Sequence, residues 1–87
     1  MSEEAELFAE FSTTRSEPAF AGIIRLHTKL VFATALRQLG DRGLAEEVTQ
    51  SVFITLSQKA TTLKMDRTVA GWLYRTTINQ ARQRLRA

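Results

Sequence analysis

The side chains best suited to chemistry form a line near the end of the chain. Trp72, Arg75, Asn79, Arg82 and Arg86 follow one another in steps of three, four, three and four residues, and these steps align side chains on a helix. Guanidinium groups bind phosphates, an indole is a platform for an unpaired base, and an amide can read a base edge. The pattern predicts a nucleic-acid-binding stripe. For the tryptophan, a place in the core is an equally good interpretation, because tryptophan is highly buried on average.

A second group of polar residues precedes this stripe. Placed around a helix axis at about 100° per residue, Glu46, Glu47 and Gln50 fall opposite the apolar residues, and Ile54 lies among them. The carboxylates would orient a basic partner and the isoleucine would supply apolar contact, so we expect a docking patch for a protein. The alternative is an isolated exposed isoleucine, which is common. A helix-turn-helix that inserts this helix into DNA is rejected, because Glu46 and Glu47 would face phosphates.

The segment between these two groups, residues 61–67, reads TTLKMDR. Its hydroxyls, basic residues and methionine would suit a pocket for an extruded base. The candidate residues in this segment are Thr61, Thr62, Lys64 and Arg67, together with Met65.

Catalysis and metal binding are not expected. His27 is the only histidine, no cysteine is present, and a transition-metal site or an activated nucleophile needs more of these side chains. Glu46 and Glu47 are adjacent, so they point about 100° apart and cannot act as a paired acid and base. His27 lies on the apolar face of its helix and is expected to be a satisfied core or boundary residue. We therefore expect no enzyme activity, no cofactor and no metal.

The charges follow a gradient along the chain. The net charge of the 87 residues is +3, but residues 1–17 hold five acids and one base, whereas residues 59–87 hold seven bases and one acid. A basic C-terminal third is consistent with a polyanionic partner. The start of the chain lacks a secretory signal, and no uninterrupted apolar run approaches the about 18 residues that span a membrane. A cytoplasmic protein without membrane contact is expected.

The apolar residues recur at helical intervals and predict an all-α fold. We expect a compact bundle of three long helices, at about 17–39, 42–60 and 69 to the end, plus a short, frayed helix at 4–11 within an acidic segment 1–15. The expected helix signals are Ser16 and Asp41 as N-caps, Gly40 as a C-terminal stop, and Thr68 as the N-cap of the last helix.

Each long helix has an expected core face, defined by residues that share one arc. For the first these are Phe20, Ile23, Ile24, His27, Val31, Ala35 and Leu39; for the second Ala45, Val48, Val52, Phe53 and Leu56; for the third Leu73, Tyr74, Ile78, Ala81 and Leu85.

Four segments together resemble region 2 of bacterial sigma factors of the extracytoplasmic-function type. They are FAGIIRLH at 20–27, ALRQLGD at 35–41, LAEEVTQSVF at 44–53 and AGWLYRTTIN at 70–79. The resemblance covers residues 16–87 and implies the sigma region 2 fold. Gln83 and Thr49 depart from the family pattern, which often has an aspartate and a hydrophobic residue there, and the second departure would loosen the core slightly. The family's second domain, a helix-turn-helix called region 4, is expected to be absent from this chain.

The resemblance also implies partners. Glu46, Glu47, Gln50 and Ile54 would dock on the clamp-helix coiled coil of the largest subunit of core RNA polymerase. The 61–67 segment would capture a flipped base of the non-template single strand at the minus-ten promoter element. Asn79 and the arginines of the stripe would contact this promoter DNA. The resemblance also implies an anti-sigma factor as a further partner.

Two hypotheses remain open at this point. The first is a sigma domain that binds core polymerase and recognises and melts the minus-ten element. The second is a helical protein-interaction module, of an antagonist or adaptor kind, whose arginines face an acidic protein. Binding to single-stranded DNA that weakens with salt would separate them, since phosphate contacts make affinity salt-dependent.

Overall fold

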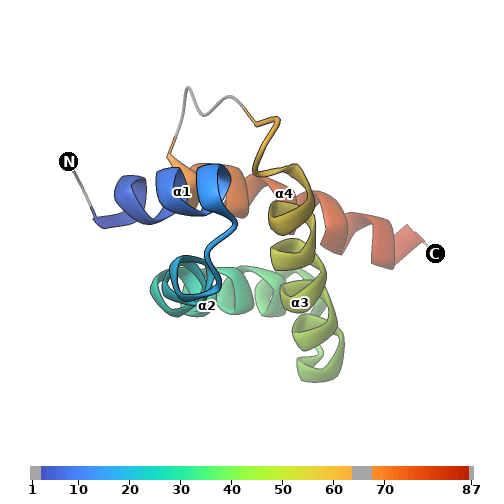
Figure 1. The fold of residues 1–87 in the computed structure, drawn as a ribbon. Coiled ribbons are helices and arrows are strands. Elements are labelled where there is room, and N and C mark those ends of the chain that lie inside the picture. Colours follow the sequence, from blue (N-terminus) through green and yellow to red (C-terminus); the bar gives the residue numbers. More distant parts are fainter. Residues whose placement is uncertain (1–2, 64–67, 87) are drawn as a thin grey trace.

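The computed structural model describes residues 3–63 and 68–86, and it is helical throughout these ranges apart from short connections. The helices are α1 (Glu3–Thr14), α2 (Glu17–Leu39), α3 (Arg42–Lys59) and α4 (Val69–Arg86) (Figure 1). The expected all-α fold of three long helices with a shorter N-terminal helix is confirmed.

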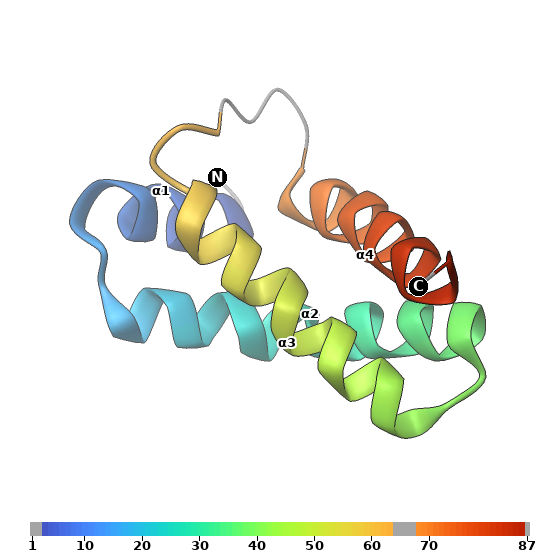
Figure 2. The same ribbon diagram turned by 90° about the vertical axis from the view of Figure 1, so that its right-hand side faces the viewer.

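Helix α2 is the centre of the bundle. It packs against α1, α3 and α4, and α3 and α4 also pack against each other. Figure 2 shows α2 along the bottom, α3 crossing in front of it, and α1 and α4 above. By length and composition α2 could also cross a membrane. In this fold the core explains part of its apolar content, because Ile23, Val31 and Ala35 are fully buried, whereas Leu26 and Leu30 of the same helix are exposed.

The predicted signals at both ends of α2 are confirmed. The Ser16 hydroxyl accepts a hydrogen bond from the backbone N–H of Ala19 at 3.2 Å, and Pro18 lies in the first turn. Gly40 ends the helix in the left-handed region with φ 68°, and its N–H donates to the Leu36 carbonyl at 2.8 Å. Glycine adopts this conformation without a steric penalty, so the chain can reverse here into α3.

The N-caps of the next two helices are also as predicted. The Asp41 carboxylate accepts from the N–H of Leu44 at 2.8 Å, and the Thr68 hydroxyl accepts from the N–H of Gly71 at 3.0 Å. These side chains satisfy N–H groups that have no partner inside the helix. They therefore fix where the two helices that carry the candidate site begin.

The core face of α3 matches the prediction in full. Its buried residues are Ala45, Val48, Val52, Phe53 and Leu56. Thr49, at a position where the family often has a hydrophobic residue, is partly buried, and its hydroxyl donates to the Ala45 carbonyl at 2.7 Å. An internal hydrogen bond of this kind lets a threonine lie beside a core.

The predicted core face of α4 is wrong at two positions. Tyr74 is 45% exposed and Leu85 is 59% exposed, whereas Val69 and Thr77 are buried beside Leu73. The Thr77 hydroxyl donates to the Leu73 carbonyl at 2.6 Å. This bond satisfies the hydroxyl, so Thr77 can be buried at low cost. The face of α4 that packs in the core therefore includes Thr77 and excludes Tyr74 and Leu85.

Helix α1 is longer than predicted and packs against the bundle. Phe8 and Phe11 are buried in the core, and the Phe11 ring stacks on Phe20 of α2 with centroids 4.6 Å apart. Leu7 lies so close to Gly22 that a Cβ atom on that glycine would be 3.0 Å from a Leu7 methyl group. The N-terminal helix is therefore seated on α2 through apolar contacts.

Candidate functional site

The outer face of α3 presents the predicted protein-binding residues together. Glu46, Glu47, Gln50 and Ile54 are all exposed, and Ile54 keeps 56% of its surface accessible. The remaining face of the helix is occupied by the core. We call these four residues the α3 patch. It combines two carboxylates, an amide and an apolar side chain on one accessible surface.

Glu47 has a partner inside the domain. Its carboxylate lies 3.4 Å from a guanidinium nitrogen of Arg84 on α4, with both side chains partly exposed. An exposed pair of this kind contributes at most about 1 kcal/mol, so an external cation can replace Arg84 easily. The sequence analysis did not identify Arg84, because the pair depends on how α3 and α4 cross.

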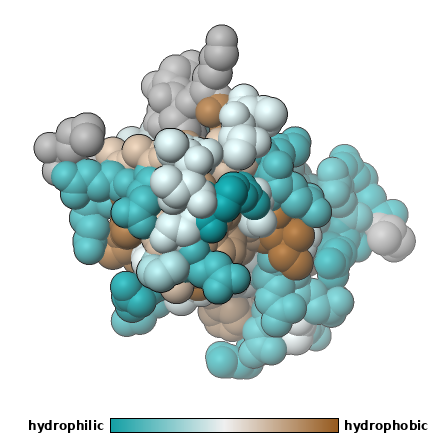
Figure 3. Space-filling model, viewed as in Figure 1, coloured by the Kyte–Doolittle hydropathy of each residue, from teal (hydrophilic) through white to brown (hydrophobic). Residues whose placement is uncertain are grey.

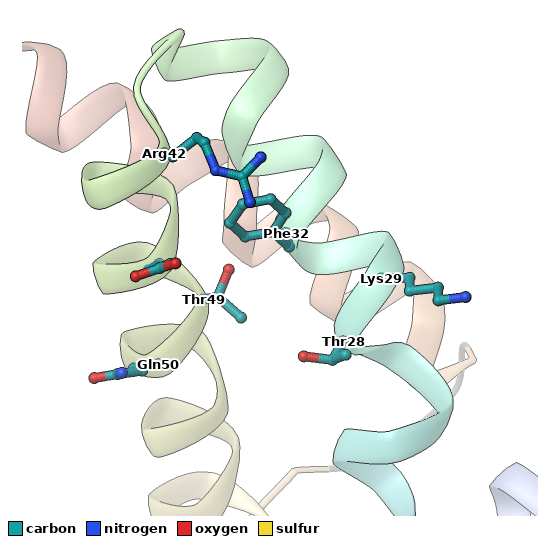
Figure 4. A pocket seen from close by; sticks show the side chains of 7 residues that line it. Thr28, Lys29, Phe32, Arg42, Thr49 and Gln50 are labelled. Carbon is teal, nitrogen blue, oxygen red and sulfur yellow. The ribbon is translucent and has the colours of Figure 1, made fainter.

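A groove between α2 and α3 adjoins the α3 patch. It encloses about 390 Å³, and Arg42 of α3 extends over the Phe32 ring of α2 with 5.5 Å between guanidinium carbon and ring centroid (Figure 4). The residues that line it are Thr28, Lys29, Phe32, Arg42, Glu46, Thr49 and Gln50. The residues from α2 and Arg42 were not predicted, since the pattern within one helix does not show which neighbour it packs on.

The basic stripe on α4 is accessible along its length. Arg75, Asn79, Arg82 and Arg86 are all exposed, and Trp72 at its head is partly buried against the core. Trp72 therefore lies at the edge of the core, and its contact with nucleic acid stays a prediction. We call these five residues the α4 stripe. It spans fourteen residue steps, or about 21 Å at 1.5 Å per residue.

The side of α4 that faces α3 is held by polar contacts. The Gln80 amide donates to the Thr55 hydroxyl at 3.0 Å. This bond joins α4 to α3 at their contact, and the exposed Glu47–Arg84 pair adds a weaker contact between the same two helices.

The predicted base-binding segment is described only in part. Thr61 and Thr62 are exposed in the turn after α3, and the Thr62 hydroxyl donates to the Lys59 carbonyl at 3.2 Å. Lys64 and Arg67, with Met65 between them, lie outside the described residues.

His27 is buried, as predicted, but its hydrogen bonding differs from the prediction. Its Nε2 atom has no hydrogen-bond partner among the described residues and lies 3.9 Å from the Glu4 carboxylate. Over residues 3–63 and 68–86, no group of three or more histidine, cysteine, aspartate or glutamate side chains is placed to hold a metal.

Charge is divided between the surfaces. Helix α4 has four arginines and no acid, whereas the carboxylates of the helices concentrate on α1 and the first half of α3. Hydrophilic residues cover most of the face in Figure 3, with small hydrophobic patches between them. The α3 patch thus suits a basic protein surface, and the α4 stripe suits a polyanion.

Comparison with protein families gives a match over most of the chain. Residues 23–87 match the sigma-70 region 2 family, and this range includes the α3 patch and the α4 stripe. No curated protein and no solved structure is significantly similar to the chain. The matched residues make up most of the sequence, and the fold is helical as that family requires. The chain therefore belongs to the sigma-70 region 2 family, whose domains bind core RNA polymerase and recognise promoter DNA in transcription initiation, and it is not an enzyme.

Proposed function

We propose that this domain is region 2 of an extracytoplasmic-function sigma factor that melts the minus-ten element. In this proposal the α3 patch docks on the clamp helices of the largest polymerase subunit, and the α4 stripe holds the non-template single strand. The observation that carries the proposal is the placement of an accessible acidic and apolar patch and an accessible basic stripe on two separate helices.

The α3 patch supports polymerase binding through its composition. Ile54 is exposed and offers apolar area at the centre of a contact, while Glu46 and Glu47 attract basic residues and Gln50 adds hydrogen bonds. The weak pairing of Glu47 with Arg84 leaves that carboxylate free to exchange partners.

The α4 stripe supports strand binding through its length and accessibility. Its arginines would contact consecutive phosphates, and Asn79 lies among them where it can read a base edge. The partly buried Trp72 would present the free part of its ring for stacking. Thr61 and Thr62 remain exposed at the start of the segment proposed to receive a flipped base, which also includes Lys64 and Arg67.

We also propose that the protein acts in the cytoplasm and is controlled by an anti-sigma factor, because the resemblance to sigma factors implies both. The second candidate, a protein-interaction module without DNA contact, is favoured only by the Glu47–Arg84 pair, in which one arginine of α4 donates to a carboxylate.

Polymerase binding is tested by pulldown of core RNA polymerase with the wild-type domain and with Glu47→Lys and Gln50→Ala. Each variant is expected to bind more weakly with its helix content unchanged. Arg84→Ala is the matched control for Glu47, because it removes the internal pair and keeps the carboxylate. Unchanged polymerase affinity in both patch variants would exclude the α3 patch as the docking surface.

Strand recognition is tested with Asn79→Ala and two single-stranded oligonucleotides, one with the minus-ten non-template sequence and one scrambled. The variant should lose about tenfold more affinity for the minus-ten strand than for the scrambled strand, because one base-reading contact is worth about 1–3 kcal/mol. Equal losses for both strands would leave only charge attraction. Binding of neither strand by the wild-type domain would favour the second candidate.

A further inference from the structure

An acidic residue of α1 reaches the beginning of the strand-binding helix. One carboxylate oxygen of Glu4 accepts a hydrogen bond from the backbone N–H of Ala70 at 3.1 Å, across 66 residues of sequence. Ala70 is the second residue of α4. The contact therefore joins the N-terminal helix directly to the first turn of the helix that carries the α4 stripe.

This hydrogen bond caps the N-terminus of α4. The first N–H groups of an α-helix have no acceptor within the helix and need one from elsewhere. In α4, Thr68 supplies the acceptor for Gly71 and Glu4 supplies the acceptor for Ala70. A carboxylate at this position also interacts favourably with the positive end of the helix dipole.

The position of Glu4 is held by its surroundings. Phe8, one helical turn further on, is buried in the core, and Leu7 packs on Gly22 of α2. The second carboxylate oxygen of Glu4 lies 3.9 Å from the buried Nε2 atom of His27. The Glu4 side chain itself is only 26% exposed, so it is part of the packed junction of α1, α2 and α4.

We propose that Glu4 is a positioning residue for strand binding, and that α1 is thereby an integral part of the DNA-binding unit. Residue 4 lies outside the family match, which begins at residue 23. By capping the first turn of α4, Glu4 holds Trp72 in place. This inference rests on the proposed function of the α4 stripe.

The direction in which Glu4→Ala changes strand affinity distinguishes a positioning role of Glu4 from a purely electrostatic one. Removing a carboxylate makes the domain more positive and should strengthen attraction to a polyanion. Glu4→Ala should instead weaken binding of the minus-ten non-template oligonucleotide, by about fivefold, which corresponds to the loss of a typical helix cap. Glu4→Gln keeps an acceptor oxygen and should restore most of the affinity. Glu6→Ala, an exposed residue in the same turn of α1, should leave affinity unchanged or slightly higher.

The experiment combines fluorescence anisotropy on these variants with amide hydrogen exchange at Ala70 in the absence of DNA. Faster exchange at Ala70 in Glu4→Ala, together with weaker strand binding and unchanged polymerase pulldown, is the expected result. Unchanged polymerase binding excludes global unfolding, since the α3 patch must still be formed. If Glu4→Ala keeps the wild-type strand affinity, or if Glu4→Gln loses as much affinity as Glu4→Ala, the positioning role is wrong, whereas the proposed function of the α4 stripe is unaffected. Absence of strand binding by the wild-type domain would overturn the proposed function and, with it, this role.

Discussion

Neutralising the α4 stripe gives the sharpest test of its role. Arg75, Arg82 and Arg86 are exposed, and none makes an ion pair with another described side chain. Replacing all three with glutamine should therefore leave the fold intact, because surface substitutions away from such contacts usually change the free energy of unfolding by less than about 0.5 kcal/mol each.

The expected magnitude follows from counterion release. Each phosphate contact on a single strand contributes about 0.7 to the slope of log affinity against log salt. If all three guanidinium groups contact phosphates, the triple variant should lose about 2 from that slope. Between about 50 and 200 mM salt, the wild-type domain should then lose about 20-fold more affinity than the variant.

The assay is fluorescence anisotropy with a labelled minus-ten non-template oligonucleotide over this range of salt. The matched control replaces Arg25, Lys29 and Arg37 of α2 with glutamine, which changes the net charge by the same amount on another exposed surface. Only the α4 variant should show the reduced slope. An equal reduction in both triple variants, or an unchanged slope in the α4 variant, would refute the assignment of phosphate contacts to the α4 stripe.

Three further predictions concern the scaffold and the α3 patch. Leu73→Ala should lower the free energy of unfolding in urea by about 2–5 kcal/mol, because the side chain is fully buried; a loss below about 1 kcal/mol would contradict its place in the core. Gly40→Ala should cost about 1 kcal/mol in the same assay, since φ is 68° and no neighbouring atom lies within 4 Å of an added Cβ; no loss would show that the turn can relax. Ile54→Ala should keep its unfolding midpoint but bind core polymerase more weakly in a competition assay, and a changed midpoint with unchanged binding would place Ile54 in the core.

The helix ends and the core face of α3 could be predicted because each is decided locally. A serine or aspartate before a helix and a glycine after one act through contacts within three or four residues. Helix α3 has apolar residues on one side and charges on the other, so its orientation toward the core follows from periodicity alone.

The orientation of α4 was harder to predict because its buried side includes a threonine. Thr77 satisfies its hydroxyl with the Leu73 carbonyl in its own helix and can then replace an apolar residue in the core. Tyr74 and Leu85 were assigned to the core by hydrophobicity, but both are exposed. The exposure predicted for Arg75, Asn79 and Arg82 nevertheless holds.

Contacts between distant parts of the chain could not be predicted from one sequence. The Glu4–Ala70 bond, the Glu47–Arg84 pair and the groove formed by Phe32 and Arg42 each depend on the angle between two helices. Helix periodicity reports which face is apolar and carries no information about these angles. The sequence therefore identified the surfaces but not the contacts that position them.

Mapping both partners on one isotope-labelled sample tests the central claim most directly. Amide chemical shifts of the domain would be followed by NMR during titration with a clamp-helix coiled-coil fragment of polymerase and, separately, with the minus-ten non-template strand. The coiled coil should perturb residues around the α3 patch, and the strand should perturb residues of the α4 stripe and the turn after α3. Perturbation of the same helix by both partners, or of neither surface by the strand, would contradict the division between a protein-binding helix and a DNA-binding helix.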